Sequence, residues 1–220
     1  LDDPLTEDNA CAASSVAAEQ SQVEVQVPIQ VEVQVQVPVQ VQVQVPVEVK
    51  TPAPVALYVV FDNSWSMYDN GLWSPAVDAL TQFVKDPASA GMDVALNYFP
   101  GNNSSCVANG YNKPEVAMGK LPGNANAIAN SLSTKGRGAI GTPIEGALYG
   151  VTDYCKTFQA AHPGQKCIAV LVTDGKPEWD SCETNQTSLA NIAKKAWETD
   201  KVRTFAVGLK GADFTLLDKI

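Results

Sequence analysis

The chain has 220 residues, of which 45% are hydrophobic and 18% charged, and this composition allows one domain with a substantial core plus an appendage. The formal net charge of -9 and the isoelectric point near 4.5 argue against binding of nucleic acid or an anionic membrane through a basic face. No apolar stretch approaches the roughly 20 residues that a membrane-spanning helix requires, so we expect no membrane span.

The first residues carry little information about fold. Residues 1–21 are acidic, rich in Ala and Ser and without periodicity, which is typical of a flexible leader. The chain begins with Leu1 rather than Met, so we expect a processed or trimmed amino terminus, which is compatible with export.

Residues 22–54 form a low-complexity repeat. From Val23 to Val49, Val or Ile occupies every odd position, and Gln, Glu or Pro occupies every even one. This alternation is typical of a strand with one apolar face, but each proline removes a hydrogen-bond donor from such a strand. Two interpretations stay open, an extended stalk or linker that projects the domain and a β-structured element that self-associates.

The segment after the repeat predicts a buried strand with a polar end. The continuous apolar run from Val55 to Phe61 is typical of a strand buried on both faces of a parallel sheet. Asp62 ends the run, and Ser64 and Ser66 follow at alternate positions. One carboxylate and two hydroxyls can therefore be aimed at a single point, and such hard oxygen donors suit Mg²⁺ better than Zn²⁺.

Strand and helix patterns alternate along the remaining residues, which predicts an α/β fold with a doubly wound, mostly parallel sheet flanked by helices. The expected elements, in chain order, are a helix from Ser74-Pro75 to Lys85, strands at 94–98 and 116–118, helices at 125–132 and 144–160, a strand at 167–173, a helix at 188–197, a strand at 202–209 and a helix that opens at Asp213.

Two further oxygen-bearing residues stand at element boundaries. Thr142 precedes the helix that starts at Ile144, and Asp174 follows the strand at 167–173. Each has a simpler explanation, since Thr142 with Glu145 fits a capping box and an Asp-Gly pair fits a turn. Because open α/β sheets bind ligands at the carboxyl ends of adjacent strands, we expect Asp174 to lie beside the end of the first strand.

The stretch Asp62-Asn63-Ser64-Trp65-Ser66 resembles the D-x-S-x-S motif of the von Willebrand factor A (VWA) family. The resemblance spans Val55 to Ile220, including the order of strands and helices, and is nearest to secreted or surface-anchored bacterial members. It implies a VWA domain at 55–220, truncated before its last strand. It also implies a metal-ion-dependent adhesion site, whose ligands would be Asp62, Ser64, Ser66, Thr142 and Asp174.

The same resemblance implies adhesion at a bacterial surface rather than catalysis. A divalent cation, Mg²⁺ or else Mn²⁺ or Ca²⁺, would capture a carboxylate of a protein or surface ligand. We expect no enzyme, because the sequence has no P-loop, no G-x-S-x-G motif and no convincing histidine partner. The alternative is a structural stalk or filament in which the domain is a scaffold with an idle metal site.

The five cysteines form no C-x-x-C pair and indicate disulfides in an oxidising compartment, hence a secreted or cell-surface protein. We expect Cys155 to pair with Cys167, because the turn at 162–165 can fold the helix back toward the strand. Cys106 and Cys182 are the second expected pair, because both loops belong at the carboxyl edge of the sheet. Cys11 is left over.

Overall fold

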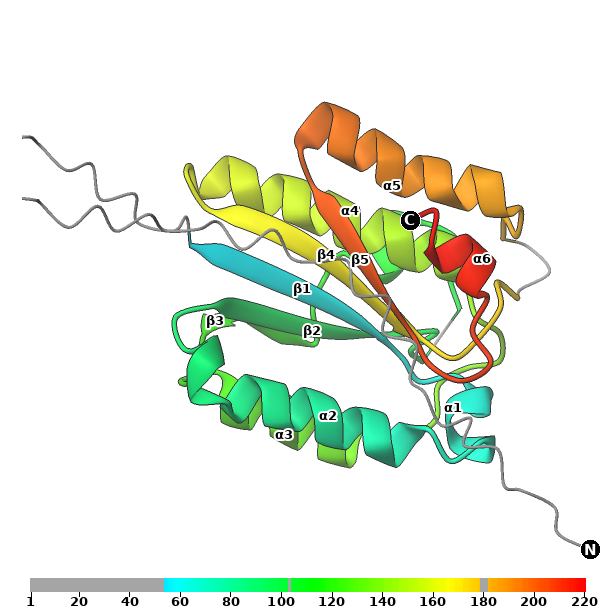
Figure 1. Cartoon of the computed structure of the whole chain (residues 1–220), viewed down its shortest axis with the longest axis horizontal. Coiled ribbons are helices and arrows are strands. Elements are labelled where there is room, and N and C mark those ends of the chain that lie inside the picture. Colours follow the sequence, from blue (N-terminus) through cyan, green and yellow to red (C-terminus); the bar gives the residue numbers. More distant parts are fainter. Residues whose placement is uncertain (1–53, 103, 179–181) are drawn as a thin grey trace, which may run out of the picture. The chain divides into compact units, whose positions relative to one another are not determined.

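The structure of the chain is a computed structural model that describes residues 54–102, 104–178 and 182–220 (Figure 1). The leader, the repeat up to residue 53 and Cys11 lie outside these residues. The expectations made for them, including the domain boundaries and self-association through the repeat, therefore stay predictions.

A five-stranded sheet in the order β3-β2-β1-β4-β5 forms the centre of the domain (Figure 1). The strands are β1 (Val55–Asp62), β2 (Asp93–Phe99), β3 (Val116–Lys120), β4 (Lys166–Thr173) and β5 (Arg203–Gly208). All neighbouring strands are parallel except β3, which runs antiparallel to β2. The mostly parallel sheet predicted from the sequence is thereby confirmed.

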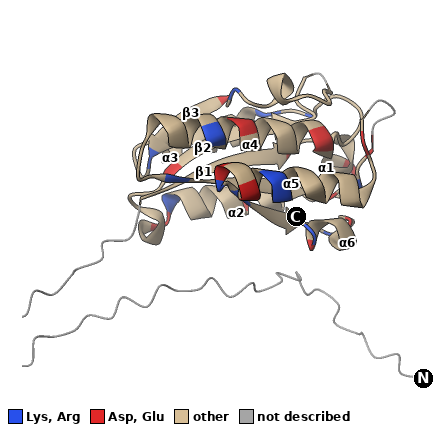
Figure 2. Ribbon diagram, turned by 90° about the horizontal axis from the view of Figure 1, so that it is seen from above, with Lys and Arg blue, Asp and Glu red and all other residues tan. Residues whose placement is uncertain are grey.

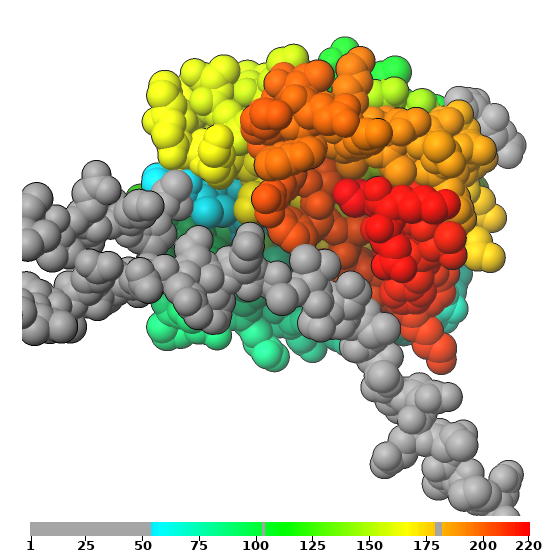
Figure 3. All heavy atoms as spheres, turned by 45° about the horizontal axis from the view of Figure 1, so that its top comes forward, coloured from blue at the N-terminus to red at the C-terminus, as the bar shows by residue number. Residues whose placement is uncertain are grey.

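Helices cover both faces of the sheet. In chain order they are α1 (Trp65–Asp69), α2 (Trp73–Lys85), the 3-10 turns η1 (Pro87–Ser89) and η2 (Ala108–Gly110), α3 (Ala125–Thr134), α4 (Ile144–Ala161), α5 (Gln186–Asp200) and α6 (Phe214–Leu217). The α2 and α3 helices lie on one face, and α4, α5 and α6 lie on the other (Figure 1). The short α6 lies beside α5 (Figure 3).

Alternate side chains of β1 contribute to two separate apolar clusters, one on each face of the sheet. Tyr58 and Val60 belong to the cluster under α4 and α5, whereas Val59 and Phe61 belong to the cluster under α2 and α3. This is why β1 needs an unbroken apolar run rather than the alternating pattern of a half-exposed strand. The central strand is consequently fixed from both sides up to Asp62.

Most ends of the elements differ from expectation by one to three residues, and three differences concern where helices begin. The residues after Asp62, expected as a loop, form the short helix α1. Helix α2 begins at Trp73 instead of at the Ser74-Pro75 pair. Helix α5 begins two residues early because the side chain of Asn185 caps it by accepting hydrogen bonds from the backbone N–H groups of Thr187 and Ser188.

The structure contains both expected disulfides. Cys155–Cys167 joins α4 to β4 inside the core, and Cys106–Cys182 joins the β2–β3 loop to the β4–α5 loop. No helix within the described residues is long and apolar enough to cross a membrane. Charged residues of both signs lie along the outer helices α4 and α5 (Figure 2).

Helix α4 lies so close to the β2–β3 loop that it needs glycine at the contact. A Cβ added at Gly146 would lie 1.9 Å from the carbonyl oxygen of Ser105, and one at Gly150 would lie 2.5 Å from the Cβ of Tyr111. The loop that carries Cys106 therefore rests directly on the backbone of α4.

We expect Gly146→Ala to lower the free energy of unfolding by about 2 kcal/mol, because overpacking against backbone costs more than the gain in helix propensity. Urea denaturation measures the change. Gly136→Ala is the control, since a Cβ there meets open space. Equal stability of the two variants would contradict the close contact between α4 and the loop.

Candidate metal centre

The parallel pairing of β1 with β4 brings two aspartates together at the carboxyl edge of the sheet. The register pairs Phe61 with Val172, so the following residues, Asp62 and Thr173, lie next to each other. The hydroxyl of Thr173 donates to Asp62 Oδ2 over 2.6 Å, and Asp174 comes next in the chain. The prediction that the two strand ends adjoin is confirmed.

The two serines of the motif connect these aspartates. The backbone N–H of Ser64 donates to Asp62 Oδ1 over 2.8 Å, and the hydroxyl oxygens of Ser64 and Ser66 lie 3.0 Å apart. Ser66 Oγ–H donates to Asp174 Oδ1 over 2.8 Å. Because Ser66 lies in α1, the first turn of this helix carries the hydroxyl back across to the end of β4.

Thr142 lies against Gly175, the residue that follows Asp174, and does not cap α4. Pro143 occupies the N-cap position, and no side chain caps this helix. Glu145 instead accepts a hydrogen bond from the backbone N–H of Glu183 over 2.8 Å, so the capping-box explanation is wrong. The buried side chain of Thr142 lies against Gly175, where an added Cβ would be 3.0 Å from Thr142 Oγ1.

The electrostatics of the cluster favour a cation. Asp62 is 0% exposed, and burial raises its pKa from the ordinary 3.8 to about 6, although hydrogen bonds from Ser64 and Thr173 lower it and the charge of Asp174 raises it slightly. Burial also raises the pKa of Asp174. Neither aspartate forms an ion pair with any Lys or Arg in the described part of the chain.

One carboxylate oxygen lacks a partner. Asp174 Oδ2 is buried and makes no hydrogen bond within the described residues, although the Asn70 side chain lies near enough to this carboxyl to lower its pKa. A buried carboxylate oxygen without a hydrogen bond is unfavourable unless a cation satisfies it. Two carboxylates and three hydroxyls are the oxygen donors that a hard divalent cation prefers, so the residues of this cluster fit such an ion.

Asn63 is a supporting residue that the sequence did not reveal. Its buried side chain accepts a hydrogen bond from the backbone N–H of Gly101 and donates one to the carbonyl of Gly136, both over 3.1 Å. Its backbone carbonyl accepts a hydrogen bond from Gly138 over 2.7 Å. Asn63 therefore ties two neighbouring loops to the end of β1, and as the variable residue of the motif it gave no signal of this role.

Large apolar side chains are exposed around the cluster. Trp65 is 50% exposed, and its indole N–H donates to the carbonyl of Gly138 over 3.2 Å, which fixes the ring beside the loop before α4. Ile140 in the same loop is 65% exposed. Arg137 lies over the Trp65 ring, 5.6 Å from its centroid, and pairs with Asp69. The rim thus combines aromatic, aliphatic and cationic groups.

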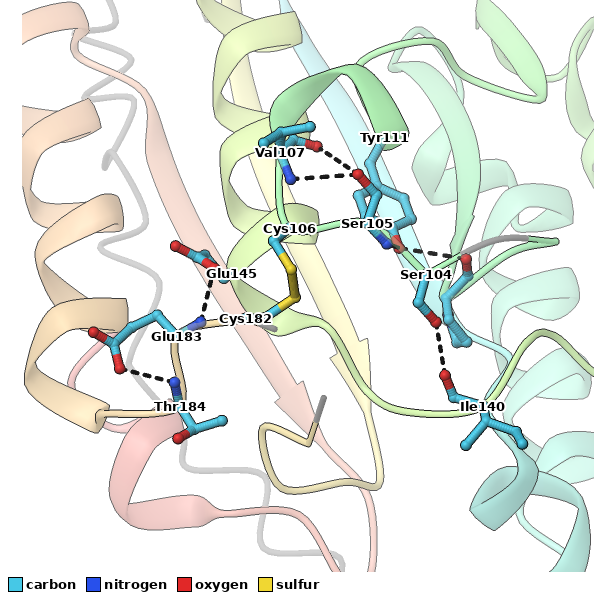
Figure 4. Close-up of a disulfide and its surroundings, with 11 residues drawn as sticks. Ser104, Ser105, Cys106, Val107, Tyr111, Ile140, Glu145, Cys182, Glu183 and Thr184 are labelled. Atoms are coloured by element: carbon cyan, nitrogen blue, oxygen red, sulfur yellow. Dashed lines mark hydrogen bonds between the residues drawn. A yellow bond between two sulfur atoms is a disulfide. The ribbon is translucent and has the colours of Figure 1, made fainter. Parts of the chain in front are cut away.

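A second group of potential metal ligands is excluded by its chemistry. Cys106, Glu145 and Cys182 have ligand atoms within 4.8 Å of one another (Figure 4). The two sulfurs are bonded to each other, so neither is available as a thiolate, and Glu145 already accepts a hydrogen bond from Glu183. This group is a structural cross-link between loops.

No protein-family model matches the chain, and no curated protein matches its sequence. Similar solved structures include manganese-loaded TRAP of Plasmodium vivax, with 14% identity, a TM-score of 0.52 and coverage of 74% of this chain and 61% of that one. Proximal thread matrix protein 1 of the mussel byssus has 20% identity, a TM-score of 0.51 and coverage of 76% and 41%. The pilus adhesin SpaC of Lactobacillus rhamnosus GG has 17% identity, a TM-score of 0.50 and coverage of 71% and 24%.

These likenesses concern the fold alone. A mostly parallel five-stranded sheet flanked by helices, with these structural neighbours, is a VWA-like fold. The chain spans less than two thirds of each of the three similar chains, whose whole activities are therefore not transferred to it.

We expect ionisation of Asp62 to destabilise the metal-free protein as the pH rises from about 4 through about 6. The raised pKa of Asp62 means that the folded state holds its proton in this range while the unfolded state has lost it, so stability is greatest below the unfolded pKa and falls to a plateau above pH 6. The effect is on the order of 3 kcal/mol. Asp174, whose pKa burial also raises, acts in the same direction.

The measurement is urea denaturation in EDTA at several pH values, with Asp62→Asn as the matched variant. The difference in stability between the wild type and this variant should change across the pH range, which separates Asp62 from all other titrating groups. A constant difference would contradict a raised pKa at Asp62.

Proposed function

We propose that the chain is an adhesion-type binding module that captures an acidic group of a ligand through a divalent cation. The cation would be held by Asp62, Ser64, Ser66, Thr142 and Asp174, with Mg²⁺ as the first choice and Mn²⁺ or Ca²⁺ as alternatives. The observation that carries the proposal is the pair of buried aspartates, linked through the serines, with Asp174 Oδ2 making no hydrogen bond within the described residues.

The residues of the cluster have different roles in the proposed site. Thr173 and the backbone of Ser64 hold the Asp62 carboxylate in place, and Ser66 orients Asp174. When bound, the cation supplies an exchangeable position at which a ligand carboxylate can replace a water. Trp65 and Ile140 offer the ligand an apolar contact beside that position.

Capture fits the site better than turnover. The one histidine of the chain, His162, follows the carboxyl end of α4, whereas Thr142 precedes the opposite end of this helix. A hydrolytic site would need a base or nucleophile near the metal. We therefore propose binding without catalysis.

The exposed rim favours a protein or other surface ligand, because Trp and Arg are the residues that most often dominate protein interfaces. One similar structure is named as a pilus adhesin and another was solved loaded with manganese, which supports both parts of the proposal. Two disulfides favour a location outside the cytoplasm. We place the protein in the secreted or cell-surface class, and the family resemblance extends this to a bacterial envelope.

A structural role is the second candidate. The alternating Val repeat before the domain favours it, since a spacer alone does not require Val at every second position. In that case the domain would be a scaffold, and metal binding would be absent or without consequence for assembly.

We expect Mg²⁺ or Mn²⁺ to raise the melting temperature of metal-stripped protein, because a ligand of the folded state stabilises it by about 2.7 kcal/mol at 100 times its Kd. The Ser64→Ala, Ser66→Ala double variant should lose this rise. Ser133→Ala, on the exposed face of α3, is the control and should keep it. Differential scanning fluorimetry measures the melting temperatures. Equal rises in the double variant and in the Ser133→Ala control would contradict the assignment.

We also expect the Mn²⁺-loaded protein to bind an acidic peptide at the site. The peptide Gly-Glu-Gly, acetylated at its amino end and amidated at its carboxyl end, should lower the relaxation rate of water protons by displacing water from the cation. The equally blocked Gly-Gln-Gly, which has no carboxylate, should not. Both are titrated at constant ionic strength. An equal effect of the two peptides, or none from either at high concentration, would contradict capture of a carboxylate.

A further inference from the structure

The loops at the carboxyl edge of the sheet are cross-linked to one another around the proposed metal site. The disulfide Cys106–Cys182 joins the β2–β3 loop to the β4–α5 loop (Figure 4). The hydroxyl of Ser104 donates to the carbonyl of Ile140 over 2.7 Å, which links the β2–β3 loop to the segment before α4. Glu178 of the β4–α5 loop is hydrogen-bonded to Thr142 in that same segment, so each of the three segments is linked to the other two.

Thr142 depends on the β4–α5 loop for its position. Its backbone N–H donates to the carbonyl of Glu178 over 2.5 Å, and the N–H of Glu178 donates back to the carbonyl of Thr142 over 3.2 Å. Its side chain lies against Gly175 in the same loop. Thr142 therefore has hydrogen-bonded support from a surface loop rather than from a strand of the sheet.

The disulfide and a hydrogen bond hold the far part of that loop. Cys182 is four residues beyond Glu178, and the backbone N–H of the next residue, Glu183, donates to the Glu145 carboxylate at the start of α4. Glu145 is the third residue after Thr142, so residues of the β4–α5 loop bond to the chain at Thr142 and again at the start of α4.

We propose that the Cys106–Cys182 disulfide is a positioning element for Thr142 at the metal site, and this inference rests on the proposed function. Breaking the bridge releases the loop that holds Thr142, so metal binding then has to order that loop as well. Changes in the groups that support metal ligands typically weaken metal affinity by 10- to 100-fold. Reduction or removal of this disulfide therefore weakens metal binding.

The second disulfide provides a matched control within the same chain. Cys155 and Cys167 are both buried, and they join α4 to the second residue of β4. The metal cluster adjoins the opposite end of β4, at Thr173. Loss of this bridge should lower global stability without moving a ligand of the metal.

The test is calorimetric titration of metal-stripped protein with Mn²⁺, comparing the wild type, Cys106→Ala with Cys182→Ala, and Cys155→Ala with Cys167→Ala. We expect the first double variant to bind Mn²⁺ at least tenfold more weakly than the wild type, and the second to bind it unchanged despite a lower melting temperature. Equal Kd values for the wild type and the first variant would overturn the inference. No binding by folded wild type would instead overturn the metal site itself.

A second measurement applies if the Cys155→Ala, Cys167→Ala control variant does not fold. Hydrogen exchange of the metal-free Cys106→Ala, Cys182→Ala protein should show exchange at the amides of Thr142 and Glu178 that is at least tenfold faster than in the wild type. The amides of the central strand β1 should exchange unchanged. Equal protection of Thr142 in both proteins would also overturn the positioning role.

Discussion

Two buried carboxylates at the end of adjacent parallel strands set the main constraint on this domain. The pairing of β1 with β4 places Asp62 and Asp174 at one edge of the sheet, where no lysine or arginine in the described part of the chain neutralises either. Burial raises the pKa of both groups, so their ionisation opposes folding. In the proposed site, a bound divalent cation would offset this unfavourable burial of charge, so metal binding would stabilise the folded domain.

Strand order explains why the cluster lies at this edge. From β1 the chain passes to β2 on one side, and it later returns to β4 on the other side. Helices on opposite faces of the sheet leave a crevice at such a reversal, and open α/β sheets bind ligands there. Three further contacts hold the surrounding segments. Ser66 of α1 donates a hydrogen bond to Asp174, and the Asn63 side chain bonds to Gly101 and Gly136 in two neighbouring loops. The Cys106–Cys182 disulfide joins the β2–β3 loop to the β4–α5 loop.

Sequence patterns predicted every strand of the described domain, and the long apolar runs of β1 and β4 reflect central strands that are covered on both faces. The expectation that open α/β sheets bind ligands at adjacent strand ends placed Asp174 beside the end of β1. The capping box, the simpler explanation of Thr142, is absent from the structure because Glu145 bonds to a residue distant in the chain. The roles of Asn63 and Thr173 were not predictable, since they arise from loops and strands that meet only in the folded protein. Both disulfides followed from the expected topology.

The most direct test of the metal site is anomalous diffraction from crystals of the protein grown with Mn²⁺. We predict one strong anomalous peak bounded by the side-chain oxygens of Asp62, Ser64, Ser66, Thr142 and Asp174, with Asp174 Oδ2 directed toward it or toward a water beside it. An Asp174→Asn crystal should lose the peak. A peak at another place in the domain, or none at saturating Mn²⁺ in well-ordered crystals, would contradict the account and leave the fold as a scaffold.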